Sequence, residues 1–422
     1  MRSPSILLTI LCHVLIGCYL PDDDFSSSPS CPVPDNDYCI YGCDSDEPCT
    51  IGCRESQLKE VWRYGDGEVS VCIVGTLLHG DKVLYRYGDR WRANDKHSGE
   101  LLWETVVNGA GTSLRSSHIM GDRLFSSDSK DIYCFDIATG DIIWHVVADK
   151  TDSRMALIGA HLYKSAYPDM ASHDTTKVIQ RFSTENGAKR IVTSYTMSGD
   201  INTFIGHPSG YVNANGDELL ITGVSGYYIG NATQQRADLI AYNLTRDSME
   251  WVLEDYFRTG GIPHAPTIAP EARRVYVKAS CAVHCLDADT GEELWTYSIP
   301  DCGATQSSRV LLVNDVAYIS EGAALYAVNA STGTLMWEHQ SEEYYASFDD
   351  LSFHEDILYG IQSSHLTAVD VTHGRLIWSE LSPDHMEDAA TGFDGKVAID
   401  SETGRVYAAD DRFMYCFEPP EL

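Results

Sequence analysis

The chain has 422 residues, of which 43% are apolar and 22% charged, and its formal net charge at pH 7 is -32. The apolar content is enough to bury a large core and excludes disorder over most of the chain, while the length indicates a domain built from repeats. The acidic charge repels polyanions and excludes nucleic acid as a partner, and its simplest interpretation is a solvated acidic surface.

Residues 1–17 are predicted to be a signal peptide, because Arg2 precedes an apolar run over residues 6–16 that is too short to span a bilayer stably. The sequence Leu-Ile-Gly-Cys at 15–18 resembles a bacterial lipobox, which implies that Cys18 begins the mature chain and carries the lipid. The alternative is a plain secretory signal with an accidental cysteine. No later segment approaches the apolar length of a membrane span, so we expect attachment to the membrane through this lipid alone.

Residues 18–57 are rich in Asp, Ser and Pro and have no periodic apolar face, so they are predicted to form an acidic tether without a core. Nine Asp or Glu residues lie between positions 22 and 55, against the single Arg54. Because like charges repel along the chain, this segment is expected to extend.

The tether is also rich in cysteine, which in an exported protein favours disulfide bonds. The tether has five cysteines, and because five is odd, one of them must pair elsewhere, pair between chains or stay free. The connectivity of the others stays open. The alternative is a metal or iron-sulfur cluster on the two C-x3-C pairs, but the spacing is not that of a zinc knuckle and no His accompanies it. The five candidates are Cys31, Cys39, Cys43, Cys49 and Cys53.

One short phrase recurs along the rest of the chain, with an Asp or Asn eight residues before a Trp. A degenerate copy places Val192 at the Trp position. Successive Trp residues lie 41 to 44 residues apart outside the stretch 144–251, a period typical of propeller blades. The six copies are Asp95 to Trp103, Asp136 to Trp144, Asn243 to Trp251, Asp287 to Trp295, Asn329 to Trp337 and Asp370 to Trp378.

Each repeat carries the four strands of a blade. In the fifth, alternating or short apolar runs predict strands at 265–269, 273–280, 282–288 and 292–298. Thr290 and Gly291 fall in the turn between the third and fourth strands, where Gly takes a positive φ without penalty. The Trp of the outer strand is predicted to dock between blades.

The two ends of the chain are expected to share a blade. Residues 405–418 supply second and third strands but no Trp, whereas residues 60–66 supply an outer strand with Trp62 and no preceding repeat. Seven complete blades and this shared one predict an all-β, eight-bladed β-propeller of four-stranded antiparallel blades over residues 58–422. Closing the ring removes the exposed sheet edge of an open array.

The pattern Ala-x-Asp-x-x-Thr-Gly-x-x-x-Trp, present as CLDADTGEELW and AVNASTGTLMW, resembles the repeat of the quinoprotein (PQQ-like) β-propellers over about residues 58–420. The lipobox and eight blades together also resemble the propeller lipoprotein of outer-membrane barrel assembly. The family's docking residues hold blades together in enzymes and non-enzymes alike. The resemblance therefore implies a structural docking role for Trp62, Trp103, Trp144, Trp251, Trp295, Trp337 and Trp378.

The cysteines of the propeller divide into two groups. Cys134, Cys285 and Cys416 occupy a slot that Ala fills in other blades, so they are expected to be small, buried and inert. Cys281 falls in a turn between second and third strands, and Cys302 falls in the link from blade five to blade six. Because those connections share a face of an up-and-down blade, we expect a disulfide between them.

No catalytic residue is predicted. The sequence lacks H-E-x-x-H, G-x-S-x-G and a phosphate loop, and residues 206–210 resemble a nucleophile elbow only superficially. The resemblance raises a PQQ-dependent dehydrogenase with calcium near the quinone, but those enzymes have long added loops and adjacent cysteines that this chain lacks. We therefore expect no metal and no cofactor, with PQQ and calcium as the alternative.

The irregular parts of blades three to five are the candidate binding face. Extra residues lie at 166–177 and 225–236, and long links lie at 195–210 and 254–266, all expected on one face. The alternative is that their aromatic residues pack on their own blades. His118, His207, His264 and His354 recur near inner strands, but their differing positions favour solvated or core histidines over a metal site. The binding candidates are Tyr167, Phe204, Tyr227, Tyr228, Tyr256 and Phe257.

These features predict a lipid-anchored, non-catalytic binding or scaffold protein of the bacterial cell envelope, at the outer membrane. We expect a monomeric propeller that recognises an envelope protein or a polysaccharide through blades three to five. The alternative function is a PQQ-dependent quinoprotein oxidoreductase. The sequence does not distinguish a sensor from a binding or scaffold protein.

Overall fold

The computed structural model divides the chain into two compact units, Met1–Ser56 and Gln57–Leu422, and each is described by itself. No helix in the described ranges combines the length and apolar character that crossing a bilayer requires. The structure describes residues 37–42, 50–55, 58–67, 73–107, 116–128, 130–149, 154–166, 176–197, 201–228, 231–257, 261–262, 264–300, 302, 309–341, 350–386 and 392–418. Cys18, Cys31, Cys43 and Cys49 fall outside these ranges.

The first unit contains an antiparallel pair of strands, β1 (Asp37–Gly42) and β2 (Thr50–Glu55). Their register sets Cys39 opposite Cys53 along the backbone. The sequence predicted a tether with disulfides and did not predict these strands, because neither segment has an alternating apolar pattern. Disulfide bonding within this unit stays a prediction.

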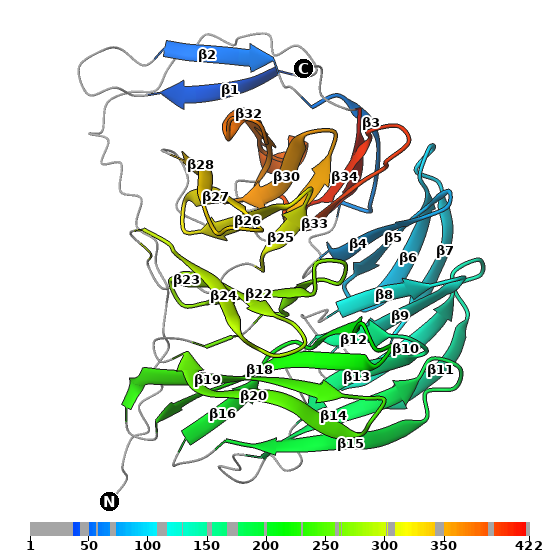
Figure 1. Cartoon of the computed structure of the whole chain (residues 1–422). Coiled ribbons are helices and arrows are strands. Elements are labelled where there is room, and N and C mark those ends of the chain that lie inside the picture. The colour runs from blue at the N-terminus through cyan, green and yellow to red at the C-terminus, as the bar shows by residue number, and fades with distance from the viewer. Residues whose placement is uncertain are drawn as a thin grey trace, which may run out of the picture. The chain divides into compact units, whose positions relative to one another are not determined.

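The second unit is an all-β propeller of eight sheets, or blades, as the repeats predicted (Figure 1). Blades one to three are built in chain order from four strands each. Their strands are β4 (Ile73–His79), β5 (Lys82–Tyr87), β6 (Arg90–Asp95), β7 (Leu101–Val106), β8 (Ser116–Met120), β9 (Arg123–Ser127), β10 (Asp131–Asp136), β11 (Ile142–Val147), β12 (Met155–Ile158), β13 (His161–Ala166), β14 (Thr176–Ser183) and β15 (Lys189–Thr196).

Blades five to seven repeat the same four-stranded order. In blade five the observed strands begin and end within two residues of the predicted ones. Their strands are β21 (Thr267–Ala269), β22 (Arg274–Ala279), β23 (Ala282–Asp287), β24 (Glu293–Ser298), β25 (Leu311–Val313), β26 (Val316–Glu321), β27 (Ala324–Asn329), β28 (Leu335–Gln340), β29 (Ser352–His354), β30 (Ile357–Gln362), β31 (His365–Asp370) and β32 (Arg375–Glu380).

Antiparallel order within each blade gives the propeller two distinct faces. The turns between first and second and between third and fourth strands emerge on one face, which we call the turn face. The turns between second and third strands and the links between blades emerge on the other, the link face. Each innermost strand therefore begins at the link face.

Blade eight is assembled from both ends of the unit, as predicted. Its strands lie in the order β3 (Glu60–Tyr64), β35 (Met414–Phe417), β34 (Val406–Ala409) and β33 (Asp394–Ile399). The register sets Trp62 opposite Cys416, and Figure 1 shows blue β3 among the red strands of the chain's end. The ring is thereby closed by backbone hydrogen bonds.

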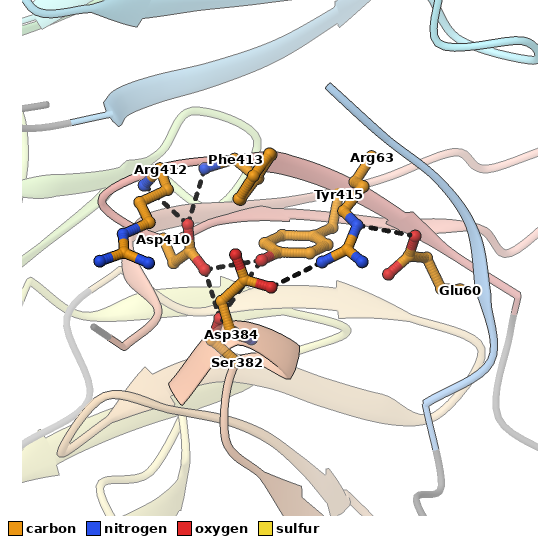
Figure 2. A network of polar contacts seen from close by, with 8 residues as sticks. All are labelled: Glu60, Arg63, Ser382, Asp384, Asp410, Arg412, Phe413 and Tyr415. Atoms are coloured by element: carbon orange, nitrogen blue, oxygen red, sulfur yellow. Dashed lines mark hydrogen bonds and ion pairs between the residues drawn. The ribbon is translucent and has the colours of Figure 1, made fainter. Parts of the chain in front are cut away.

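Polar contacts reinforce this closure (Figure 2). Arg63 Nη1 on β3 lies 2.6 Å from Asp384 Oδ1 in the short helix η1 (Pro383–Met386), which belongs to the link from blade seven. The buried Asp410 carboxylate accepts bonds from the Tyr415 hydroxyl at 2.7 Å and from the Ser382 hydroxyl. Strand β3 is thus tied to η1 as well as to its ladder partner β35.

The Asp of the repeat shapes the turn before each outer strand. Asp287 Oδ1 accepts hydrogen bonds from the backbone N–H groups of Asp289 and Thr290 at 3.0 and 2.9 Å. Gly291 follows with a φ of 74°. Asn329 makes the same bonds to Ser331 and Thr332 N–H, which explains why either Asp or Asn occupies this position.

Each repeat Trp packs on the turn of the following blade. The indole N–H of Trp251 donates to the Ala288 carbonyl at 3.0 Å, and a Cβ added to Gly291 would lie 2.9 Å from the same indole. Trp62, Trp103, Trp144, Trp295 and Trp337 make the equivalent bond to blades one, two, three, six and seven. The buried Trp378 Nε1 has no hydrogen-bond partner among the described residues.

The seam between blades three and four lacks this arrangement. Val192 is half-buried against a cluster that includes Leu220 and the turn residue Leu244. The position that Gly occupies in the other turns is Asp247, with a φ of 57°. The loss of the indole in one blade thus coincides with the loss of the Gly in the next.

Blade four is longer than the others. Its strands are β16 (Ile201–Ile205), β17 (Ser209–Val212), β18 (Glu218–Tyr228), β19 (Asn231–Asn243) and β20 (Ser248–Phe257), and β16 and β17 pair successive parts of β18. Residues 225–236 were predicted to be a loop. Of these, residues 225–228 and 231–236 instead lengthen β18 and β19 at the link face, because β16 provides ladder partners for residues 224–228.

The five propeller cysteines that the structure describes follow the sequence expectations. Cys281 and Cys302 form a disulfide with an S–S distance of 2.11 Å. Cys134, Cys285 and Cys416 are free and buried, and burial raises the pKa of each thiol to about 11. A thiol with so high a pKa holds little of the reactive thiolate at neutral pH.

Candidate axial site

The predicted binding face is only partly described. Tyr167 lies outside the described residues, and the side chains of Phe204, Tyr227 and Tyr228 are likewise not described although their backbones lie in β16 and β18. Tyr256 is 37% exposed at the link-face end of β20. These residues stay candidates for binding.

Phe257 differs from the expectation of an exposed aromatic residue. It is 5% exposed and packs in the core cluster that joins blades four and five. Its ring makes an edge contact with His284 at a centroid distance of 4.9 Å. Only small edges of this ring are open to a partner, because the strand pleat turns Phe257 inward where Tyr256 turns outward.

Tyr256 itself is fastened to blade five. Its hydroxyl donates to the Glu293 carboxylate, which also lies 3.0 Å from His284 Nδ1. Burial raises the pKa of the Glu293 carboxyl, but hydrogen bonds from Tyr256, His284 and Thr296 outweigh that effect and lower it. The ring is therefore held in one orientation at the seam, where a docked partner would meet it preformed.

A cavity of about 750 Å³ lies on the propeller axis. All eight blades contribute to its wall near the beginning of their innermost strands, so it lies toward the link face. Three of the four recurrent histidines, His118, His207 and His264, line it, whereas His354 ends β29 and does not. The ranges that line it are 75–77, 116–118, 154–157, 207–210, 264–268, 309–312, 350 and 395–396.

Several polar side chains around the axis fasten neighbouring blades. His118 Nε2 donates to the Met155 carbonyl at 2.7 Å, and Ser209 Oγ donates to the Pro266 carbonyl at 2.6 Å. Ser352 Oγ on β29 donates to Val397 O at 2.6 Å. These groups satisfy backbone carbonyls that the innermost strands would otherwise leave open, so they maintain the ring.

Charged side chains enter the cavity from four blades. Arg154, Arg309 and Lys396 are cationic, and Asp350 is the only carboxylate among the described lining residues. Arg154 Nη1 lies 3.7 Å from Asp350 Oδ2. The described part of the lining thus carries three cationic side chains and one carboxylate, in a chain with a net charge of -32.

The pKa shifts show that these groups influence one another. Burial lowers the pKa of Lys396, Asp350 opposes that shift, and Arg309 and Arg154 lower it further. Burial likewise lowers the pKa of His118, with Arg309 and Lys396 acting in the same direction. The neutral form of His118 is therefore favoured, although its hydrogen bond to Met155 opposes this lowering of the pKa, and the positive charge of the lining comes from the three longer side chains.

The charged residues of the cavity were not predicted from the sequence, although their spacing from the ends of the innermost strands could have identified them. Arg154, Arg309 and Asp350 each stand four residues before the end of an innermost strand, at Ile158, Val313 and His354. Aligning the innermost strands of the repeats would place these residues at one level. The histidines near these strands were the residues considered for a site at the axis, because imidazole is the commonest metal ligand in proteins.

The lining residues do not fit a quinone with calcium. Calcium takes 6–8 oxygen ligands, whereas Asp350 is the only lining carboxylate described and faces Arg154. No group of three His, Cys, Asp or Glu side chains is placed to hold a metal ion within the described ranges. Cys281 and Cys302 are not adjacent, and neither lines the cavity.

Comparison with known proteins points to one family. The family model described as outer membrane protein assembly factor BamB matches residues 73–226 and 233–418. No curated protein matches the sequence. The structure resembles BamB from Moraxella catarrhalis, with a TM-score of 0.57, 13% identity, and coverage of 86% of this chain and 97% of that one.

Enzymes share the same architecture. A europium-containing methanol dehydrogenase gives a TM-score of 0.62 at 11% identity, covering 84% of each chain. The quinohemoprotein alcohol dehydrogenase of Comamonas testosteroni gives 0.64 at 10% identity, covering 87% of this chain and 78% of that one. At such identities the likeness establishes the fold, and activity has to be argued from the site.

Proposed function

The chain belongs to the family of the outer membrane protein assembly factor BamB, and we propose that it is a non-catalytic scaffold protein of the bacterial cell envelope. The family match over most of the propeller carries this proposal. The axial cavity supports it as well, because its described lining offers hydrogen bonds that join neighbouring blades, together with a cationic cluster.

Partner recognition is assigned to the link face of blades three to five. Blade four projects there through the lengthened β18 and β19, and Tyr256 is held rigidly at the adjacent seam. A rigid aromatic side chain loses little conformational entropy when a partner binds, which favours affinity. The partner is an envelope protein, and a polysaccharide is the other outcome that a binding test can reveal.

Site-specific photo-crosslinking in intact envelopes tests this face. A photoreactive residue at Tyr256 is expected to capture a partner protein, and Arg246 is the matched control because it lies in the turn at the opposite end of the same strand. Crosslinks at Arg246 but not at Tyr256 would contradict the assignment. Crosslinks to glycan at Tyr256 would identify a polysaccharide binder.

Attachment to the membrane is proposed to depend on Cys18, through the lipid that the lipobox-like sequence implies. Replacement of Cys18 by Ala is expected to move the protein from the membrane fraction to the soluble periplasmic fraction and to abolish incorporation of a labelled fatty acid. A labelled, membrane-bound Cys18→Ala variant would contradict this anchor.

A quinoprotein oxidoreductase is the second candidate, favoured by the dehydrogenases of similar fold. The chain would be incubated with PQQ and calcium and assayed for a quinone absorbance band and for dye reduction with alcohols. We expect neither signal, because the lining described above lacks calcium ligands. Turnover in this assay would replace the scaffold function with the enzymatic one.

A further inference from the structure

The axial cavity has a charge opposite to that of the molecule around it. Residues from separate blades bring Arg154, Arg309 and Lys396 to one cavity, and Asp350 supplies the single carboxylate among the lining residues that the structure describes. In a chain with 62 acidic and 30 basic residues, chance placement would favour an acidic lining. A local reversal of charge inside a concave site focuses the field on an anion.

Two of the three cations are available to a ligand. Arg154 faces Asp350 at 3.7 Å, whereas the side chains of Arg309 and Lys396 make no hydrogen bond or ion pair with a described residue, and Asp350 acts on Lys396 only through its charge. Burial disfavours the charged form of Lys396, and the neighbouring guanidinium groups add repulsion. An anion placed between these groups would relieve both costs at once.

The cavity walls are preorganised to hold such an anion. Hydrogen bonds between blades fix the innermost strands, as His118 to Met155 and Thr267 to the Val310 carbonyl illustrate. The cations therefore project from strands that need no rearrangement. The volume of about 750 Å³ lies in the range of small-molecule sites and greatly exceeds that of a single inorganic ion.

From this geometry we propose that the axial cavity binds a small organic polyanion, a molecule that carries two or more carboxylate or phosphate groups. Arg309 and Lys396 bind its anionic oxygens directly. Arg154 contributes after its ion pair with Asp350 opens or is shared. This site is centred on the axis, whereas the proposed partner contact is tested at Tyr256, which does not line the cavity, so either proposal can fail without the other.

Binding is measured by isothermal titration calorimetry on the full chain, with citrate as the carboxylate probe and pyrophosphate as the phosphate probe. Saturable binding of one or both is expected, weakening as salt is added because the attraction is electrostatic. Citrate alone would identify a carboxylate ligand, and pyrophosphate alone a phosphate ligand. The absence of saturable heat with both probes would overturn the proposal.

A pair of double variants separates the cavity from the overall charge. Lys396→Gln with Arg309→Gln is expected to weaken binding by about tenfold or more, since each charged hydrogen bond lost is worth at least that factor. Lys130→Gln with Arg375→Gln removes the same charge from exposed positions and is expected to leave affinity unchanged. Equal losses in the two double variants would overturn the assignment to the axis.

A third variant acts in the opposite direction. Asp350→Asn removes the carboxylate that competes for Arg154, so anion affinity is expected to rise several-fold. A variant that merely damaged the fold would weaken binding instead. Weaker binding by Asp350→Asn, with an unchanged thermal midpoint, would count against direct competition between Asp350 and the ligand and overturn the proposed arrangement.

Discussion

At the scale of single residues, the Trp and Gly of the repeat act as one unit. The Gly has a positive φ, and an added Cβ would stand 2.6 to 2.9 Å from the indole of the preceding blade at Gly99, Gly140 and Gly291. Where the preceding blade offers Val192 instead, the turn tolerates Asp247 at a φ of 57°. The Gly is therefore required by the indole more than by the turn.

Two substitutions to Ala at this same turn position test that conclusion. Gly333→Ala places a Cβ 2.7 Å from Trp295 and is expected to cost about 2–4 kcal/mol in the free energy of unfolding. Asp247→Ala keeps an existing Cβ and loses the hydrogen bond from Tyr242, so about 1 kcal/mol is expected. Denaturant unfolding measures both, and similar costs would show that the indole is not the cause.

At the scale of elements, the turn before the outer strand depends on an ionised carboxylate in several blades. The N–H of Ser98 donates to Asp95 at 2.8 Å, and this bond lowers the pKa of Asp95 more than burial raises it. A carboxyl whose folded pKa lies below its unfolded value stabilises the fold above the unfolded pKa. That contribution is lost as the pH falls through the folded pKa.

The consequence is a defined difference in acid sensitivity. Asp95→Asn keeps an acceptor oxygen, as Asn329 does naturally, and is expected to lose less stability than the parent protein between pH 5 and about pH 3. Asn329→Asp is expected to lose more. Unfolding free energy measured against pH checks both, and parallel curves for all three proteins would contradict the role of the carboxylate.

The strands of regular blades were predictable because alternation and turn chemistry agree within each repeat. In blade five the two signals locate every strand to within two residues. Blade four departed from prediction at residues 225–236, which exceed the length of the other repeats and were therefore interpreted as a loop. Their strand structure depends on pairing across blade four, which local sequence does not encode.

At the scale of the whole molecule, closure depends on a short strand from the start of the propeller. Loss of β3 would leave β35 as an open edge and would remove Trp62 from Gly99 and from the Lys96 carbonyl. The polar contact between Arg63 and Asp384 would be lost as well. The five residues of β3 thus contribute backbone pairing, docking of an indole and an ion pair to the closure of the ring.

Two truncations test the importance of this closure. A chain that begins at Gln57 is expected to unfold cooperatively at the midpoint of the full chain, since the propeller unit begins there. A chain that begins at Asp66 is expected to lose at least about 3–5 kcal/mol, the usual cost of removing a buried Trp. A peptide of residues 57–66 added in trans is expected to restore the loss. Equal midpoints for both truncations would contradict this prediction.

The candidate site was predictable only in part at this scale. The sequence placed histidines near the inner strands, and three of the four reached the cavity. The cationic cluster was not predicted, because Arg154, Arg309 and Lys396 are separated by 155 and 87 residues and converge only through the curvature of the closed ring. Sequence spacing reports position along a strand, whereas the charge of the axis is the sum over all blades.

The seam between blades three and four is the seam at which Val192 replaces the docked Trp of the repeat. Seven seams are fastened by an indole, whereas here Val192 packs against the cluster that includes Leu220, and the Tyr195 hydroxyl donates to the Asp238 carboxylate at 2.9 Å. A seam with fewer buried aromatic contacts opens locally at a lower free energy. Backbone amides of β15 are therefore expected to exchange with deuterium earlier than those of the outer strands in the other blades.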